Sequence, residues 1–277
     1  MLISIITPSF RNSRWLKLCI TSVADQGVEL EHIIQDSCSD DGTQDWLPAD
    51  RRVKAFIEKD QGMYDAVNRG LRRAQGDILA YINCDEQYLP GALASVRNYF
   101  EDNPGVEVVF ADTIVVDTQG DYICHRRACL PGKYHSWVSG NLAILTCATF
   151  FRRSLIDERG FFFNPTLKDV GDAEWVIRLI ESKVRMGVLK EFTSVFTETG
   201  MNMNLLPNAQ KEKAELLASA PTWARRCRPA LIWHYRLRRL LFGHYQQKPF
   251  TYSLFSKESP ATRRTVHVSK PSFRWRQ

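Results

Sequence analysis

The chain has 277 residues, 44% of them hydrophobic, which is enough to bury a substantial core in one large or two smaller domains. It has no apolar run of about 18 residues and no basic leader with a cleavage site, so we expect neither a membrane-spanning helix nor a signal peptide. Seven cysteines without a C-x-x-C pair favour free thiols and a cytoplasmic protein, and the six histidines lack zinc-ligand spacing.

The net charge of +6 is concentrated in the C-terminal part of the sequence. Between Arg225 and Arg276, Glu258 is the only acidic residue among many Arg and Lys. Upstream of about residue 215 the two signs nearly balance. The C-terminal segment is therefore expected to contact something negative: a lipid headgroup surface, a nucleic acid or an anionic polymer.

Short apolar runs alternate with helical patterns through the first 110 residues. The runs predict strands at Leu2–Thr7, His32–Ile34, Val53–Ile57, Ile78–Ile82 and Val106–Phe110. Apolar residues at helical spacing predict helices around residues 15–23, 63–71 and 90–100. This alternation predicts an α/β fold built on a mostly parallel, doubly wound sheet.

The pattern changes after residue 112. Ile114–Val116 and Tyr122–Cys124 flank a turn that contains Gly120, which predicts a small antiparallel hairpin. Further predicted elements are a strand at Ala148–Phe151, a helix from Gly171 to Ile180 and a basic amphipathic helix at Leu231–Leu241. From Lys257 onward the composition is polar and basic, which is typical of a segment without fixed structure.

The most informative stretch is residues 80–86, where a buried strand ends in the adjacent carboxylates Asp85 and Glu86. Open α/β sheets bind ligands outside the carboxyl ends of their strands. Hard oxygen ligands at that point suit Mg²⁺ or Mn²⁺ carrying a diphosphate. Taken alone, such a pair is more often solvated surface than a site.

Three other predicted strands also lead into polar loops, at residues 7–12, 36–43 and 58–70. In a parallel sheet these loops open on one edge, and together with the carboxylate pair they predict a nucleotide site there. The sequence contains no G-x-G-x-x-G after the first strand and no G-x-x-x-x-G-K-[ST]. These absences argue against a Rossmann dinucleotide site and a P-loop.

Taken together, these loops resemble family 2 glycosyltransferases with the GT-A fold. The matching stretches keep the family's order and cover roughly residues 2–200: Ser4–Phe10, Glu31–Thr43, Asp60–Gly70, Gly76–Glu86, Tyr88–Leu93, Ala148–Arg153 and Gly171–Glu174. The resemblance implies an inverting enzyme that uses a nucleotide sugar. It places Glu86 where the family usually has a second aspartate, and Gly171 where an acidic residue often precedes the base.

The same resemblance implies a role for each matching site residue. The residues implied to bind the donor nucleotide are Thr7, Pro8, Ser9, Asp36, Asp60, Asn68 and Asp85. Asp85 and Glu86 would hold a divalent cation, Mn²⁺ or Mg²⁺, and Asp172 would be the general base.

Local alternatives stay open for several of these residues. Asp172 could be a helix N-cap, Asp36 part of an Asx-turn, and Asp60 a cap of the helix that follows it. Glu174 could also be the base, although an acidic residue favoured by the helix dipole is the better interpretation.

The sequence thus predicts a metal-dependent, inverting glycosyltransferase that moves a sugar, with UDP the expected carrier, to a hydroxyl of a glycan or lipid-linked acceptor in polysaccharide biosynthesis. Residues 1–215 would form the GT-A catalytic domain, with the nucleotide-binding half at about 1–112 and the acceptor half at 113–215. Residues 216–277 would form a basic helical extension on the anionic inner face of the cell membrane. The alternatives are a nucleotidyltransferase and a basic nucleic-acid-binding protein, and only the C-terminal segment supports nucleic acid as a partner.

Overall fold

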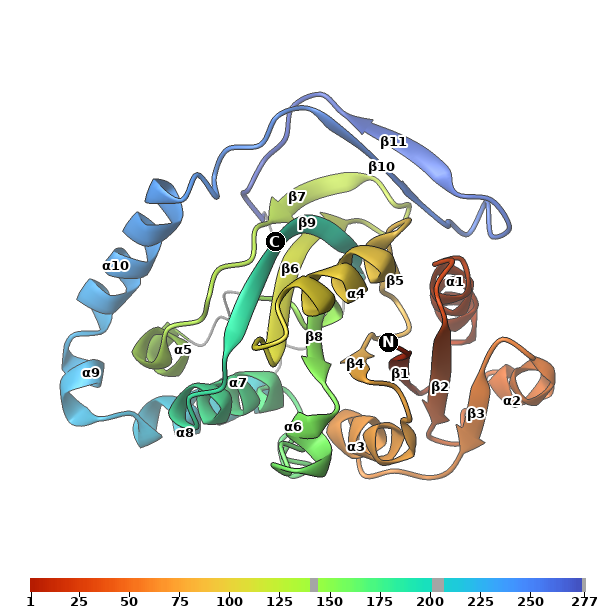
Figure 1. The fold of residues 1–277 in the computed structure, drawn as a ribbon, viewed down its shortest axis with the longest axis horizontal. Coiled ribbons are helices and arrows are strands. Elements are labelled where there is room, and N and C mark those ends of the chain that lie inside the picture. The colour runs from red at the N-terminus through yellow and green to blue at the C-terminus, as the bar shows by residue number, and fades with distance from the viewer. Residues whose placement is uncertain (140–143, 201–206, 276–277) are drawn as a thin grey trace.

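The computed structural model describes residues 1–139, 144–200 and 207–275 (Figure 1). Within these residues, nine strands form one mixed sheet in the order β3-β2-β1-β4-β8-β6-β9-β5, and β7 pairs with β6. A second, two-stranded sheet is formed by β10 and β11 near the C-terminus. The predicted mostly parallel α/β sheet with a small antiparallel element is confirmed.

The N-terminal half of the sheet is parallel. Its strands are β1 (Ile3–Ser9), β2 (Leu30–Asp36), β3 (Lys54–Ile57) and β4 (Ile78–Tyr81). The connecting helices are α1 (Ser13–Ala24), α2 (Thr43–Trp46) and α3 (Met63–Arg73), and a short 3-10 helix spans Leu47–Ala49. Ile3, Ile5 and Ile6 are fully buried because helices cover both faces of the sheet, as the apolar runs predict.

The second half of the sheet is mixed. Its strands are β5 (Gln87–Tyr88), β6 (Val108–Val116), β7 (Tyr122–Arg126), β8 (Thr149–Arg152) and β9 (Met186–Thr197). Strand β8 is antiparallel to both β4 and β6, whereas β9 is parallel to β6. The antiparallel β6–β7 pair, with Gly120 in its turn at φ +83°, confirms the predicted hairpin.

The sequence patterns did not predict β9. Its apolar pattern is broken by Lys190 and Glu191, both exposed, at the point where the pairing with β6 shifts register between Ala111 and Thr113. An irregularity of this kind places charged residues in the middle of a strand without interrupting its pairing.

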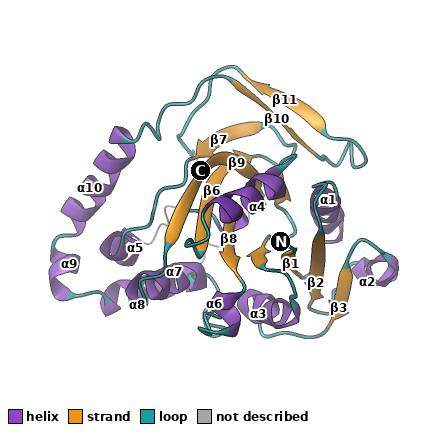
Figure 2. Ribbon diagram, in the orientation of Figure 1, coloured by secondary structure: helices purple, strands orange, loops and turns teal. Residues whose placement is uncertain are grey.

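Helices pack on both faces of the sheet (Figure 2). The remaining ones before the C-terminal segment are α4 (Ala92–Asp102), α5 (Lys133–Ser139), α6 (Ser154–Asp157) and α7 (Gly171–Glu181), and a 3-10 turn spans Thr146–Ala148. One core cluster joins α3 and α7 to the sheet through Val67, Leu79 and Trp175. A second joins α1 and α4 to it through Val23, Ala80 and Val96.

The C-terminal segment is only partly helical. Its elements are α8 (Pro207–Ser219), α9 (Thr222–Arg226), α10 (Arg228–Leu241), β10 (Phe250–Leu254) and β11 (Arg264–Val268). The expectation of a segment without fixed structure after Lys257 is wrong for β11, because Val268 is buried in a cluster with Tyr252 and Ile114. Among the described helices, none is both long and apolar enough to cross a bilayer.

Close packing of α3 on β1 gives a test of this arrangement. A Cβ atom on Gly70 would lie 2.4 Å from Cγ2 of the buried Ile6. We therefore expect Gly70→Ala to lower the free energy of unfolding by about 1–2 kcal/mol in urea denaturation, even though Ala is favoured over Gly in a helix by roughly 1 kcal/mol. Gly132→Ala is the control, since its Cβ would make an ordinary 3.8 Å contact with His135. Equal stability of the two variants would contradict the packing.

Candidate active site

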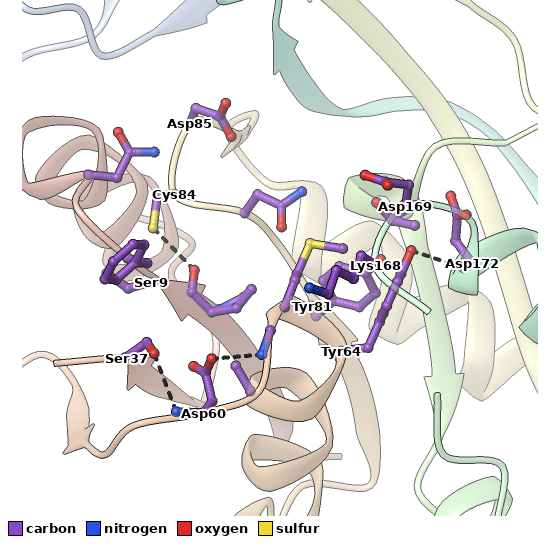
Figure 3. A pocket seen from close by; sticks show the side chains of 18 of the residues that line it. Ser9, Ser37, Asp60, Tyr64, Tyr81, Cys84, Asp85, Lys168, Asp169 and Asp172 are labelled. Carbon is purple, nitrogen blue, oxygen red and sulfur yellow. Dashed lines mark hydrogen bonds between the residues drawn. The ribbon is translucent and has the colours of Figure 1, made fainter. Parts of the chain in front are cut away.

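A cavity of about 580 Å³, here called the central cavity, lies at the carboxyl ends of the parallel strands and faces the start of α7. Five of the predicted site residues line it: Pro8, Ser9, Asp60, Asp85 and Asp172. Figure 3 shows Ser9 and Asp60 on one side of the cavity and Asp172 on the other. Asp85 and Asp172, which come from different halves of the chain, thus share one space.

Thr7 and Asn68 are also predicted site residues, but neither is among the residues that line the central cavity. The hydroxyl of Thr7 is buried and lies 2.9 Å from Nε2 of His32. The amide of Asn68 is bonded on both sides to the backbone of Phe163, donating to its carbonyl at 2.7 Å and accepting from its N–H at 2.9 Å. These contacts give Thr7 a core position and make Asn68 a link between α3 and the loop before α7.

Asp36 is fully buried and lies behind the cavity lining. Its Oδ2 accepts hydrogen bonds from the hydroxyls of Ser9 at 2.8 Å and Ser39 at 2.7 Å, and its Oδ1 accepts from the N–H of Ser39 at 2.8 Å. Part of the role of Asp36 is therefore the local turn with Ser39 that the sequence allows. Through Ser9, Asp36 also fixes a hydroxyl that does line the cavity.

Asp60 combines a local and a cavity role. Its Oδ1 accepts the N–H of Gly62 at 2.9 Å, just before α3 begins, and its own N–H donates to the hydroxyl of Ser37 at 3.3 Å. Both Asp60 and Ser37 line the central cavity. The turn before α3 thereby holds a carboxylate and a hydroxyl side by side at the cavity wall (Figure 3).

The adjacent carboxylates Asp85 and Glu86 differ in placement. Asp85 lines the cavity, and burial together with the negative charge of Glu198 raises its pKa. Glu86 is 1% exposed, does not line the cavity, and accepts the N–H of Asn83 at 2.7 Å. Burial and the charge of Asp85 raise the pKa of Glu86. The predicted direct role of Glu86 at a metal therefore gains no support from its position.

The oxygen ligands around Asp85 suit a cation that is also bound by the phosphates of a substrate. Among the described residues, no group of three or more His, Cys, Asp or Glu side chains could hold a metal by itself. Mg²⁺ is typically bound by one or two carboxylates together with substrate phosphates and water. Asp85 fits that pattern, with Glu198, which follows β9, as a second carboxylate on the same cavity.

Asp172 lies in the first turn of α7, which begins at Gly171. Its Oδ1 accepts the N–H of Ala173 at 2.7 Å, and its own N–H donates to the hydroxyl of Tyr64 at 3.1 Å. Val170 is the N-cap position, so the predicted alternative of Asp172 as the cap does not describe this helix. Burial raises the pKa of Asp172 to about 6.

Tyr64 explains why a glycine precedes Asp172. A Cβ on Gly171 would lie 2.6 Å from the ring of Tyr64, which is itself 2% exposed. An acidic residue at this position would collide with that ring. Tyr64 thus packs α3 against the start of α7 and contacts the backbone of Asp172.

Glu212 of α8 holds the loop that precedes Asp172, a role that no sequence signal indicates. Its carboxylate accepts the N–H groups of Lys168, Asp169 and Val170 at 3.0, 3.0 and 3.1 Å. Lys168 and Asp169 line the central cavity beside Asp172. These hydrogen bonds lower the pKa of Glu212, although burial opposes them.

Replacing Glu212 tests this support. We expect Glu212→Gln to lower the free energy of unfolding by about 1–3 kcal/mol at neutral pH, because backbone N–H groups lose a charged acceptor. The folded protein lowers this carboxyl's pKa, so its stabilisation is present above the unfolded pKa and is lost as pH falls through the folded pKa. The difference between the two proteins should therefore shrink in acid. Glu215→Gln is the control, since Glu215 is 63% exposed, and an equal loss in both variants would contradict the role.

Solved structures share this fold. S. aureus TarS 1-349 in complex with UDP-GlcNAc is similar with a TM-score of 0.62 and 16% identity, covering 87% of this chain and 73% of that chain. The mannosyltransferase PcManGT from Pyrobaculum calidifontis, in complex with GDP-Man and Mn²⁺, has a TM-score of 0.53 and 16% identity, covering 85% and 75%. At such identities the likeness shows the GT-A fold alone.

Sequence relatives match shorter stretches. The putative teichuronic acid biosynthesis glycosyltransferase TuaG of Bacillus subtilis is 37% identical over 93 residues, which are 31% of this chain and 37% of that protein. The GalNAc(5)-diNAcBac-PP-undecaprenol beta-1,3-glucosyltransferase of Campylobacter jejuni is 30% identical over 120 residues, or 41% and 38%. The chain thus covers less than half the length of either relative. Glycosyl transferase family 2 matches residues 4–160, which is more than half of the chain, and the chain therefore belongs to that family.

Proposed function

We propose that the protein transfers a sugar from a nucleoside diphosphate sugar, with UDP as the carrier, to a hydroxyl of a glycan or lipid-linked acceptor. The observation that carries the proposal is that Asp85 and Asp172 line one cavity from two sides. The choice of donor is supported by TarS, which has been solved with UDP-GlcNAc. The choice of acceptor is supported by the Campylobacter relative, which is named for a PP-undecaprenol substrate. Family membership favours this function over nucleotidyl transfer or nucleic-acid binding.

The donor would lie along the parallel strand ends. The hydroxyls of Ser9 and Ser37 and the carboxylate of Asp60 offer hydrogen bonds to a base and ribose. Asp85 would hold a divalent cation, Mn²⁺ or Mg²⁺, which when bound neutralises charge on the departing diphosphate. PcManGT, solved with Mn²⁺, supports a cation in this fold.

Asp172 would act as the general base on the acceptor hydroxyl. Its carboxylate faces the same cavity, and its backbone is fixed by the hydroxyl of Tyr64. A base that removes the acceptor's proton while the acceptor attacks the anomeric carbon directly gives one displacement, which inverts the configuration. A pKa of about 6 leaves Asp172 ionised at neutral pH and close to the range in which a base works best.

Replacing Asp172 should separate chemistry from binding. We expect Asp172→Asn to lower kcat about 10²–10⁴-fold while the affinity for UDP, measured by calorimetry, stays near that of the wild type. The matched control is Glu174→Gln on the same helical turn, where Glu174 is paired with Arg178 at 2.6 Å. A large loss of turnover in Glu174→Gln with retained turnover in Asp172→Asn would transfer the role to Glu174.

The pH profile gives that test a second readout. Because the base must be ionised and its pKa is about 6, kcat/KM of the wild type should fall as pH drops below about 6. The residual activity of Asp172→Asn should not show this acid limb.

The two adjacent carboxylates offer a sharper test of the metal. We expect Asp85→Asn to reduce metal-dependent transfer about 100-fold or more and to weaken the stabilisation by UDP that depends on Mn²⁺, measured by thermal shift. Glu86→Gln should leave both properties near the wild type, because Glu86 is buried outside the cavity lining. Equal losses in both variants would show that Glu86 also binds the metal.

We also propose that α10 rests on the anionic inner face of the cell membrane, which would bring the enzyme to a lipid-linked acceptor. Trp233, Leu241 and Phe242 at its surface are 66%, 77% and 64% exposed. Exposed Arg236 and several other Arg residues accompany them. Large apolar side chains interleaved with arginines are typical of a helix that lies in a membrane interface.

Flotation with lipid vesicles tests this contact. The wild type should float with phosphatidylglycerol vesicles and much less with phosphatidylcholine vesicles, because both apolar burial and charge contribute. Trp233→Ser combined with Leu241→Ser should abolish flotation. Arg185→Gln removes an exposed charge outside this segment and should float like the wild type. The proposal would be rejected if flotation were equal with both kinds of vesicle and unchanged in the double variant.

A further inference from the structure

Two arginine side chains, Arg239 buried and Arg126 partly buried, form no ion pair with an acidic side chain among the described residues. Arg239 of α10 is 6% exposed, and Arg126 ends β7, more than a hundred residues earlier in the chain. Within the described residues, neither guanidinium forms an ion pair or a hydrogen bond. Burial and the nearby charge of Arg239 lower the pKa of Arg126. Arginine is almost never buried in this way unless it is paired.

The groups around these arginines are aromatic rings and neutral histidines. The guanidinium of Arg239 lies 5.9 Å from the ring of Tyr235 and 5.4 Å from that of Tyr245. The ring of Tyr235 stacks on His135 of α5 with centroids 3.7 Å apart. Burial and Arg239 lower the pKa of His135 to about 4, so this ring stays uncharged at neutral pH.

Several polar atoms in the same cluster also lack a partner among the described residues. They are Nε of Arg239, the hydroxyl of Tyr235, Nδ1 of His135 and Nδ1 of His244. These atoms come from α5, α10 and the turn after α10, and each is buried. Every one of these groups can donate a hydrogen bond, although a histidine nitrogen does so only in the matching tautomer. Buried donors without acceptors are costly unless an acceptor binds to them.

The acidic side chain that interacts electrostatically with Arg239, Asp112, already has hydrogen-bond partners. Asp112 of β6 accepts hydrogen bonds from the guanidinium of Arg127 and from the N–H of Ala128. The sequence of the residues outside the described ranges contains no Asp or Glu. Among the described residues, no carboxylate lies within ion-pair distance of Arg126 or Arg239, so this cluster supplies positive charge and hydrogen-bond donors.

We propose that Arg126 and Arg239, together with the hydroxyl of Tyr235, bind a phosphate or diphosphate group at a site separate from the central cavity. A guanidinium presents paired N–H groups that match phosphate oxygens, and hydroxyls add further donors. The aromatic rings hold the two cations in place before the anion arrives. None of these three residues lines the central cavity, so this site does not depend on the proposed transfer reaction.

The phosphate group can come from solution or from the headgroup of a lipid-linked molecule. Both sources share the chemistry that the arginines recognise. The same helix, α10, carries the exposed Trp233 and Leu241 on its surface. A prenyl diphosphate would add contacts for its chain there, whereas inorganic pyrophosphate would not.

Binding of inorganic pyrophosphate, measured by calorimetry in EDTA to exclude the metal-dependent donor site, tests the proposal. The wild type should bind, and Arg239→Met and Arg126→Met should each weaken binding at least about 30-fold. Arg185→Met is the control, because Arg185 is exposed and lies outside this cluster, and it should bind like the wild type. Absent binding to the wild type, or unchanged affinity in the Arg126 and Arg239 variants, would overturn the proposal.

Thermal unfolding distinguishes a ligand site from a structural role. Without pyrophosphate, Arg239→Met should melt at or above the wild-type temperature, because an unpaired buried charge is replaced by an apolar chain of similar length. With pyrophosphate, the wild type should become the more stable protein. A variant that melts lower by the same amount in both conditions would show a structural arginine and overturn the site. Tighter binding of farnesyl diphosphate than of pyrophosphate would indicate a lipid source, and equal binding a soluble one.

Discussion

The contact between Tyr64 and the start of α7 is the interaction on which the rest of the site depends. Its ring occupies the space that a side chain at residue 171 would fill, and its hydroxyl accepts the N–H of Asp172. Because α3 lies between β3 and β4 of the parallel half and α7 belongs to the second half of the chain, this contact joins the two halves. It is the reason that Asp172 faces the same cavity as Asp85.

Electrostatics divides the molecule into two regions. The central cavity is lined by Asp60, Asp85, Asp169, Asp172 and Glu198 together with Lys59 and Lys168, so carboxylates predominate and favour a cation. Burial raises the pKa of Asp85 and of Asp172, and the charge of Glu198 adds to the shift at Asp85. The region between β7, α5 and α10 has the opposite sign, with the buried Arg239, the partly buried Arg126 and uncharged histidines. A nucleotide sugar bound with a cation suits the first region, and a bare phosphate suits the second. The two regions are suited to different anions because of this difference in charge.

Sequence reasoning predicted the strands with continuous apolar runs and the loops that follow them, because burial on both faces leaves a clear local signal. It placed Ser9, Asp60, Asp85 and Asp172 on what proved to be a common cavity. It did not distinguish the residues that line the cavity from those that hold the lining residues in place. Asp36 and Asn68 occupy motif positions, yet their side chains hold Ser9 and the backbone of Phe163, which depends on rotamers that no sequence pattern reveals.

The remaining features come from contacts between distant segments. Glu198 follows β9, whose pattern is interrupted by charged residues, and Glu212 reaches the loop before α7 from a helix that only the tertiary structure places there. The most direct measurement of the central claim is a crystal structure with UDP and Mn²⁺. We expect the uridine beside Ser9 and Asp60, the metal on Asp85, and Asp172 facing the diphosphate across the cavity. A nucleotide bound elsewhere, or a metal that Asp85 does not contact, would contradict it.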